Sequence, residues 1–201
     1  MKKIIIIVIL ALFGIAQTQA QVSFKPGIRG GLNFSHFTND IYNNNGYYDV
    51  YGNYINSGSS DFNSKTDFYL GFFGALKLTR YYTLQPGIDY SNQGTTYKDI
   101  NNSSAKLNVS YLSISVLNKF TFNDKFNVHL GPTIDFVVDK NFDVESDVDL
   151  AFQLGAGYNF TDNFGIEARV KKGIVPVIYD SGSDHTNVVF QLGATYTFDV
   201  K

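Results

Sequence analysis

Apolar residues occupy every second position in one segment after another of this chain. In residues 150–160 the apolar positions are Leu150, Phe152, Leu154, Ala156, Tyr158 and Phe160. Small or polar residues fill the positions between them. Because a β-strand points successive side chains to opposite faces, each such segment has one apolar face and one small or polar face. A barrel that spans a lipid bilayer shows this pattern, with its apolar face outside and its polar face inside.

The alternation predicts an all-β fold, an eight-stranded antiparallel transmembrane β-barrel with a polar lumen and a lipid-facing apolar exterior. The lipid-facing residues all carry even numbers, as in Phe24, Ile88, Ile114 and Phe190. The predicted strands are 23–36, 66–79, 82–93, 107–122, 125–137, 148–160, 164–176 and 186–199.

Short and long connections alternate between these strands. The pairs Arg80-Tyr81 and Asn123-Asp124 and the triplet 161–163 consist of residues that form tight turns. The segments 37–65, 94–106, 138–147 and 177–185 are longer. Outer-membrane barrels have short periplasmic turns and longer extracellular loops, so both ends of the barrel domain are expected on the periplasmic side.

The chain begins with the features of a secretory signal peptide. Lys2 and Lys3 precede the apolar run 4–15, and a small residue, Ala20, ends a short polar segment suited to cleavage. The apolar run is too short for a transmembrane helix, which needs about 20 apolar residues. We therefore expect residues 1–20 to be a signal peptide and residues 21–201 to form the barrel domain. Export and a barrel together predict the bacterial outer membrane.

Composition excludes several kinds of function. Without residues 1–20 the chain has 14 basic and 18 acidic residues, so it offers no basic surface for nucleic acid. Cysteine is absent, which excludes a disulfide framework, a thiol nucleophile and a cysteine-based metal site. No cofactor motif is present. The predicted partners are outer-membrane lipid and, beyond it, an extracellular ligand or a periplasmic protein, with the oligomeric state left open.

The inward-facing positions collect charged residues. A structural charge network in the lumen is predicted from Arg29, Lys77, Asp89, Lys119, Asp135, Glu167 and Arg169. The four basic residues of this set are expected to pair with the three acids and close the barrel to solute, because unpaired buried charges are costly. An eight-stranded barrel is only just wide enough inside for side chains, so a wide pore is not expected.

The first long connection has an unusual composition. It carries Tyr42, Tyr47, Tyr48, Tyr51 and Tyr54 among several asparagines, glycines and serines. This mixture is typical of adaptable recognition surfaces, and these tyrosines define a candidate recognition loop. A flexible loop whose tyrosines rest on the barrel rim is the alternative.

Two further groups bear on chemistry. His129, Ser113 and Ser115 carry odd numbers and so are expected to face the lumen. A hydrolase arrangement therefore needs consideration, although no motif identifies a nucleophile. The acidic residues of the third long connection, from Asp139 to Asp149, lack the spacing of a calcium-binding EF-hand loop. We expect neither catalysis nor metal binding at these residues.

Several strand segments resemble the PorT-like outer-membrane β-barrel family of Bacteroidetes. The resemblance rests on residues 27–35, on 84–90 followed by Gly94, on 111–120, on Gly131-Pro132 and on 155–158. The family usually has proline where Ser115 stands and often an acid where Ser113 stands. It implies the barrel fold and the outer membrane, but no single activity, and one namesake assists protein secretion.

The predicted function is a non-enzymatic structural or binding role through long extracellular loops. A secretion accessory protein, a lipid-modifying barrel enzyme and a narrow channel remain as alternatives. The rival fold is a soluble barrel like that of lipocalins, in which the apolar face lies inside and the charges lie outside. It remains an alternative because the alternation alone does not say which face of the strands points into the barrel.

Overall fold

The computed structural model describes residues 22–38, 41–42, 47–48, 54–55, 59–98, 104–180 and 183–200, and their side chains in 22–38, 63–96, 104–177 and 185–200. The predicted signal peptide lies outside the described residues. The eight long strands are β1 (Ser23–Phe37), β5 (Ser59–Lys77), β6 (Tyr82–Lys98), β7 (Ser104–Phe122), β8 (Phe126–Lys140), β9 (Val148–Asn159), β10 (Phe164–Gly173) and β13 (Asn187–Thr197). The short strands are β2 (Ile41–Tyr42), β3 (Tyr47–Tyr48), β4 (Tyr54–Ile55), β11 (Ile178–Asp180) and β12 (Ser183–His185).

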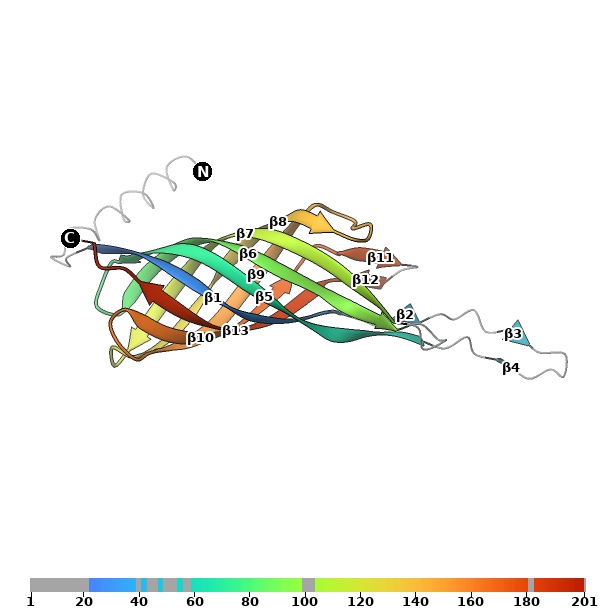
Figure 1. The fold of residues 1–201 in the computed structure, drawn as a ribbon, viewed down its shortest axis with the longest axis horizontal. Coiled ribbons are helices and arrows are strands. Elements are labelled where there is room, and N and C mark those ends of the chain that lie inside the picture. Colours follow the sequence, from blue (N-terminus) through green and yellow to red (C-terminus); the bar gives the residue numbers. More distant parts are fainter. Residues whose placement is uncertain are drawn as a thin grey trace, which may run out of the picture.

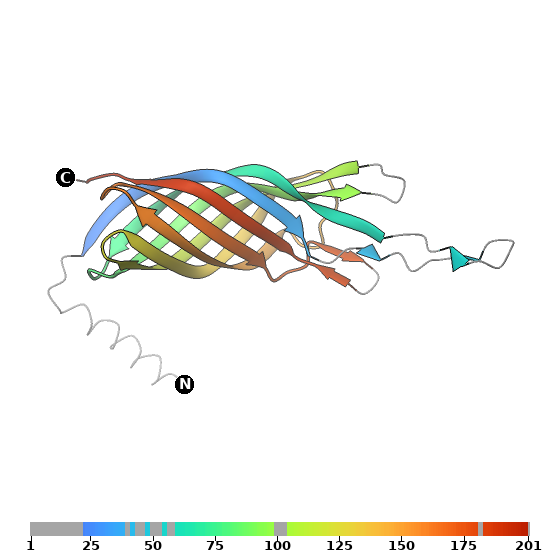
Figure 2. The same ribbon diagram turned by 90° about the horizontal axis from the view of Figure 1, so that it is seen from below.

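The eight long strands form one closed antiparallel sheet (Figures 1 and 2). Each pairs with the next long strand along the chain, and β1 closes the barrel by pairing with both β5 and β13. Arg29 illustrates the closure, because it lies between Thr195 on one side and Gly71 on the other. The predicted eight-stranded barrel is therefore confirmed.

The faces of the barrel follow the predicted parity. On β9, the side chain of Leu154 is 53% exposed on the outside, whereas that of Gln153 is 2% exposed in the lumen. Large apolar side chains such as Phe72, Ile166 and Phe190 cover the exterior. A soluble barrel would carry these residues inside, so the lipocalin-like alternative is excluded. In the described residues, no helix is long and apolar enough to cross a membrane.

The short turns form where the sequence predicts them. Asn123 and Asp124 connect β7 to β8 with positive φ angles of 52° and 58°, a conformation that Asn and Asp tolerate better than other side chains. In the turn before β6, Thr79 Oγ1 accepts hydrogen bonds from the backbone N–H groups of Tyr81 and Tyr82. Thr161 does the same for Asn163 and Phe164 before β10.

Aromatic rings surround this end of the barrel. Ring pairs close to the short turns include Tyr82–Phe120, Phe122–Phe126, Phe160–Phe164 and Tyr196–Phe198. An aromatic girdle of this kind marks a membrane–water interface. The last described residues of the chain lie at the same end (Figure 1), which is therefore the periplasmic end.

The strands β5, β6 and β7 exceed their predicted lengths by the most, whereas β1 and β8 exceed theirs by only one or two residues. β5, β6 and β7 have 19, 17 and 19 residues, whereas a tilted strand crosses the membrane with about 9–11. They continue beyond the barrel on the side opposite the C-terminal tail (Figure 2), and we call the added residues 59–65, 94–98 and 104–106 the β5–β7 wall. Most of the predicted loop 94–106 is thus strand, and the last residues of the predicted loop 37–65 belong to β5. Outside the membrane an outward side chain meets water, so the alternation that identifies a lipid-facing strand is absent there.

Two smaller differences lie at the same end. β10 ends at Gly173 rather than at residue 176, because the chain leaves the sheet where Val175 N–H donates to Asp149. The predicted loop 177–185 contains the β11–β12 hairpin, in which Ile178 pairs with His185.

Candidate functional site

The lumen is the part of the molecule where charged groups meet. Arg29 on β1 donates from Nε and Nη2 to the two carboxylate oxygens of Asp89 on β6, each at 2.7 Å. Its Nη2 also donates to Ser115 Oγ at 3.0 Å. The guanidinium group lies over the ring of Phe73, 5.7 Å from its centre. A buried, bidentate pair of this kind is the strongest geometry an arginine and a carboxylate can adopt.

Two glycines make room for this pair. Gly71 lies directly opposite Asp89, and a Cβ atom there would come within 1.8 Å of Asp89 Oδ1. A Cβ atom at Gly87 would come within 2.7 Å of Arg29 Nη2. The glycines on the inward parity of β5 and β6 thus serve a close approach of side chains in a narrow lumen.

A second ion pair lies beside the first. Arg169 Nε on β10 is 3.3 Å from Glu167 Oε1, and Arg169 Nη1 is 3.9 Å from Asp89 Oδ2. Tyr69 on β5 donates from its hydroxyl to Glu167 Oε1 at 3.4 Å, and Arg169 lies over its ring at 4.6 Å. These contacts are longer than those of Arg29, so Glu167 is held more loosely than Asp89.

A third pair lies closer to the extracellular end. Lys171 Nζ donates to Asp135 Oδ2 at 2.5 Å and to Ser113 Oγ at 3.3 Å, and it lies 5.8 Å from the centre of the Tyr111 ring. Asp149, which faces Asp135 across β8 and β9, accepts the Val175 backbone N–H. Arg29, Arg169 and Lys171 therefore each lie next to both a carboxylate and an aromatic ring.

Amide side chains fill the lumen between β1, β6 and β13. Asn33 donates to Ser91 Oγ at 3.0 Å and to the backbone carbonyls of Phe68 and Asn92. Gln191 donates to Asn33 Oδ1 at 2.7 Å, and Asn187 donates to Gln93. This layer continues the polar filling toward the extracellular side.

An apolar cluster closes the extracellular end. Phe37, Val109, Tyr111 and Val177 are buried together, and Leu107, Val137, Phe142 and Val144 pack against them. We call these eight residues the apolar cap. It was not expected from the sequence, because a polar lumen was predicted throughout. The signal that points to it is the presence of Phe37, Val109 and Tyr111 at inward positions, and Tyr69 and Phe73 stand out in the same way next to the lumen cations.

Two members of the predicted network do not join it. Lys77 and Lys119 line an open cavity at the periplasmic end, and neither is within ion-pair distance of a carboxylate among the described side chains. Asp135 pairs instead with Lys171, an inward-facing residue that is not part of the predicted network. The register of β7 and β8 explains why Lys119 does not pair with Asp135. Lys119 lies opposite His129, whereas Asp135 lies opposite Ser113, which is six residues from Lys119 along β7.

The same register separates the residues considered for hydrolysis. Six residues along a strand correspond to about 20 Å, so His129 and Ser113 are too far apart to share a proton. His129 Nδ1 lies 3.3 Å from Asn127 Oδ1, while Ser113 and Ser115 hold Lys171 and Arg29. Among the described residues these side chains form no catalytic arrangement.

The acidic loop and the tyrosine-rich loop gave two further expectations. Lys140 Nζ donates to Asp147 Oδ1 at 2.8 Å, and within the described ranges no three acidic or histidine side chains gather in a way that could hold a metal. The side chains of Tyr42, Tyr47, Tyr48 and Tyr54, and Tyr51 entirely, lie outside the described residues.

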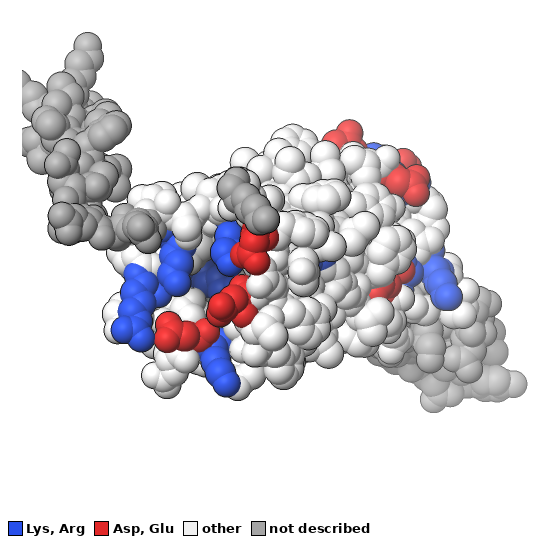
Figure 3. Space-filling view, turned by 60° about the vertical axis from the view of Figure 1, so that its left-hand side comes forward, with Lys and Arg blue, Asp and Glu red and all other residues white. Residues whose placement is uncertain are grey.

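Ion pairs also link elements at the periplasmic rim. Lys25 Nζ on β1 lies 2.6 Å from Asp199 Oδ1 in the tail that follows β13. Hydrogen bonds from Lys25 and from Asn163 hold the pKa of Asp199 below its ordinary value. Arg80 Nη2 lies 3.2 Å from Asp124 Oδ2 and so joins two neighbouring turns. Figure 3 shows charged side chains around this hollowed end and an uncharged belt beyond it.

Comparisons with known proteins give a matching family and similar solved structures. Residues 16–179 match the sequence model of a family described as outer membrane protein beta-barrel domain. Neisserial surface protein A is 13% identical with a TM-score of 0.52, and the match covers 86% of this chain and 97% of that one. The outer membrane protein OprG of Pseudomonas aeruginosa is 14% identical with a TM-score of 0.47, over 92% and 100% of the two chains. A comparison of the sequence with curated proteins gives no match.

Proposed function

Because this chain belongs to the outer membrane protein β-barrel domain family and lies in the bacterial outer membrane, we propose that it is a non-enzymatic barrel that binds a partner at the cell surface. The observation that carries the proposal is the combination of a filled lumen with the β5–β7 wall. The wall uses strand length that the membrane does not require, so its role lies outside the membrane.

The filled lumen argues against a channel. Arg29 and Arg169 are each 1% exposed, and the amide layer and the apolar cap follow them toward the extracellular side. A permeating ion would need to displace side chains that hold one another through ion pairs and hydrogen bonds. The distance between His129 and Ser113 argues in the same way against a lipid-modifying enzyme.

The PorT-like family and the cleaved signal peptide, both expected from the sequence, are part of this proposal. The PorT-like resemblance supports placing the chain in that branch of outer-membrane barrels, and export through a cleaved signal peptide of residues 1–20 fits the location. A secretion accessory role would use the periplasmic turns instead of the β5–β7 wall. No contact among the described residues favours that role.

The proposal is tested by replacing residues 39–63, which comprise the connection after β1 and most of the β5 part of the wall, with a short Gly-Asn linker. Intact cells that carry either form are treated with a surface crosslinker, and the partners recovered with the barrel are compared. We expect the parent to retain one crosslinked species that the variant loses. The matched control replaces the periplasmic turn residues Asn123-Asp124 with Asn-Gly, which should leave crosslinking unchanged.

A planar-bilayer measurement distinguishes the channel alternative. We expect no stepwise conductance from the purified parent. Single-channel currents, or the same crosslinked species from the parent and the loop variant, would contradict the proposal. A species lost only when the periplasmic turn is changed would favour the secretion role.

A further inference from the structure

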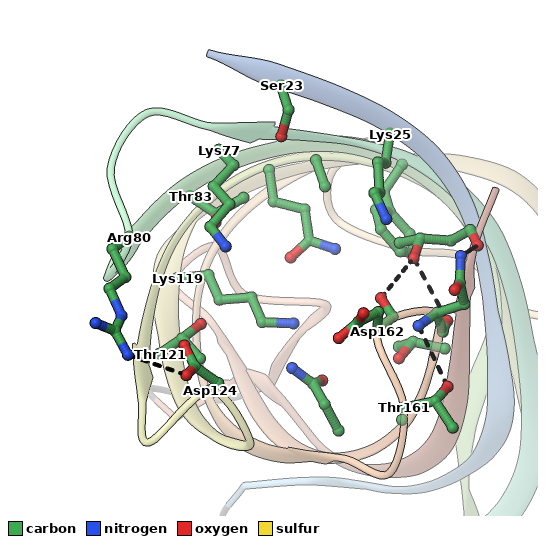
Figure 4. Close-up of a pocket in the computed structure, with 18 residues that line it drawn as sticks. Ser23, Lys25, Lys77, Arg80, Thr83, Lys119, Thr121, Asp124, Thr161 and Asp162 are labelled. Atoms are coloured by element: carbon green, nitrogen blue, oxygen red, sulfur yellow. Dashed lines mark hydrogen bonds and ion pairs between the residues drawn. The ribbon is translucent and has the colours of Figure 1, made fainter. Parts of the chain in front are cut away.

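The periplasmic end of the barrel holds a cavity of about 500 Å³. Its wall includes Lys25, Lys77, Thr83, Gln85, Lys119 and Asp162 (Figure 4). In this view the side chains of Lys77 and Lys119 extend from one wall into the cavity, while Arg80 turns away toward Asp124. The charge network described above lies deeper in the lumen, so the cavity opens toward the periplasm.

The two lysines lie in one row of the sheet. Lys77 on β5 is directly opposite Thr83 on β6, and Thr83 is directly opposite Lys119 on β7. The Cα atoms of the two lysines are therefore about two strand spacings apart, roughly 10 Å. Lysine side chains are long enough to converge from that separation on a group held over the Thr83 hydroxyl. Gln85, two residues deeper on β6, adds a buried amide to the floor of the cavity.

The neighbouring carboxylates form their ion pairs with other cations. Arg29, Arg169 and Lys171 pair with Asp89, Glu167 and Asp135 deeper in the lumen. At the rim, Lys25 pairs with Asp199, and Arg80 pairs with Asp124. Among the described side chains, Lys77 and Lys119 have no carboxylate within ion-pair distance, and Lys119 is already half-buried. A cation in that position is stabilised by an anion that enters the cavity.

We propose that Lys77, Thr83 and Lys119 bind a phosphate-class oxyanion at the periplasmic mouth of the barrel. Two ammonium groups, one hydroxyl and the Gln85 amide line the same cavity. A tetrahedral phosphate presents its oxygens in several directions and can meet donors from different strands, whereas the two oxygens of a carboxylate lie in one plane with its carbon. The phosphate is either a free solute of the periplasm or part of a phospholipid headgroup. Asp162, in the turn between β9 and β10, lies across the cavity from the two lysines (Figure 4), and its negative charge limits the affinity.

The test uses the full mature chain in dodecyl maltoside micelles, which contain no phosphate, with inorganic phosphate titrated at constant ionic strength. Binding is followed by calorimetry and by NMR of the lysine side chains. We expect the signals of Lys77 and Lys119 to shift and that of Lys106, an exposed lysine near the extracellular end of β7, to stay fixed. Lys119→Met and Lys77→Met should each weaken binding by about tenfold, because each removes one charged hydrogen-bond donor.

Two further variants test whether phosphate binding depends on the charges around the cavity. Lys106→Met should leave phosphate binding unchanged, and Asp162→Asn should strengthen it. The source of the phosphate is distinguished by repeating the titration in nanodiscs that contain phosphatidylglycerol. Weaker phosphate binding there supports the site and assigns it to a lipid headgroup, whereas equal binding supports the site and assigns it to a free solute.

Two results would overturn the proposal. One is a parent protein that binds no phosphate in the phosphate-free micelles. The other is equal phosphate affinity in Lys77→Met, Lys119→Met and the parent. Lys77 is exposed at the mouth, so its variant is expected to fold even if Lys119→Met does not.

Discussion

Arg29 on β1 and Asp89 on β6 form a bidentate ion pair directly over Gly71, the residue of β5 that lies between them. Three neighbouring strands thus contribute one cation, one empty position and one anion. The pair ties the strand that closes the barrel to the third strand along the sheet. It therefore contributes to closure as well as to the filling of the lumen.

Asp89→Asn should destabilise the barrel strongly. Removing one charge of a buried pair leaves the other uncompensated, which costs about 3–5 kcal/mol. Glu167→Ala should also destabilise the barrel but by less, because the contacts of Glu167 with Arg169 and Tyr69 are longer. Reversible urea unfolding in lipid vesicles measures both free energies of unfolding. Glu145→Gln in the exposed acidic loop is the control, and an equal effect there would show that the lumen pairs do not stabilise the barrel.

Gly71→Ala should disrupt the same pair without changing any charge. The added methyl group would overlap Asp89 Oδ1 and the Ile88 carbonyl oxygen, so the carboxylate must move away from Arg29. We expect a loss of about 1–3 kcal/mol in the free energy of unfolding from overpacking alone. In the control Gly74→Ala, the methyl group meets only the end of the Phe24 ring, which can turn aside. Similar losses for both variants would contradict the close-approach explanation.

Leu154→Arg should be costly because Leu154 faces lipid near the middle of β9. An arginine at the bilayer midplane costs about 2–4 kcal/mol, falling to about 0–1 kcal/mol near the interface. Val148→Arg, on the same face at the extracellular end of β9, is therefore the matched control. Unfolding of both variants in lipid checks the expected depth dependence. A Val148→Arg variant as unstable as Leu154→Arg would place the membrane differently along the strand.

The contact between Lys25 and Asp199 should weaken at low pH. The folded-state pKa of Asp199 is depressed, chiefly by the hydrogen bond from Lys25. A depressed carboxyl pKa contributes stability above the unfolded value, near 4, and that contribution is lost as the pH falls through the folded value. NMR titration should therefore give an Asp199 midpoint below the ordinary one, and Lys25→Met should raise it. An unchanged midpoint in Lys25→Met would show that the pair does not form in solution.

Most of the barrel can be predicted from the sequence because its signals are local. Side chains alternate with a period of two, so Leu154 and Gln153 are assigned to lipid and lumen without knowledge of any other strand. The Asn123-Asp124 turn is equally local. Prediction is less successful for the β5–β7 wall, because outside the membrane both faces of a strand can be polar. For the charges, the sequence identifies which residues point inward but not which of them meet.

The sequence by itself determined the membrane location, the number of strands and the face on which each strand residue lies. Only the tertiary structure decided that Arg29 pairs with Asp89 over Gly71, that Asp135 pairs with Lys171, and that Lys77 and Lys119 line an open cavity. Only the structure brings Phe37, Val109 and Val177 together in the apolar cap. The physical reason is that these contacts join strands far apart in the chain. They depend on the register that closes the barrel and on the few positions without a Cβ atom where side chains can approach closely.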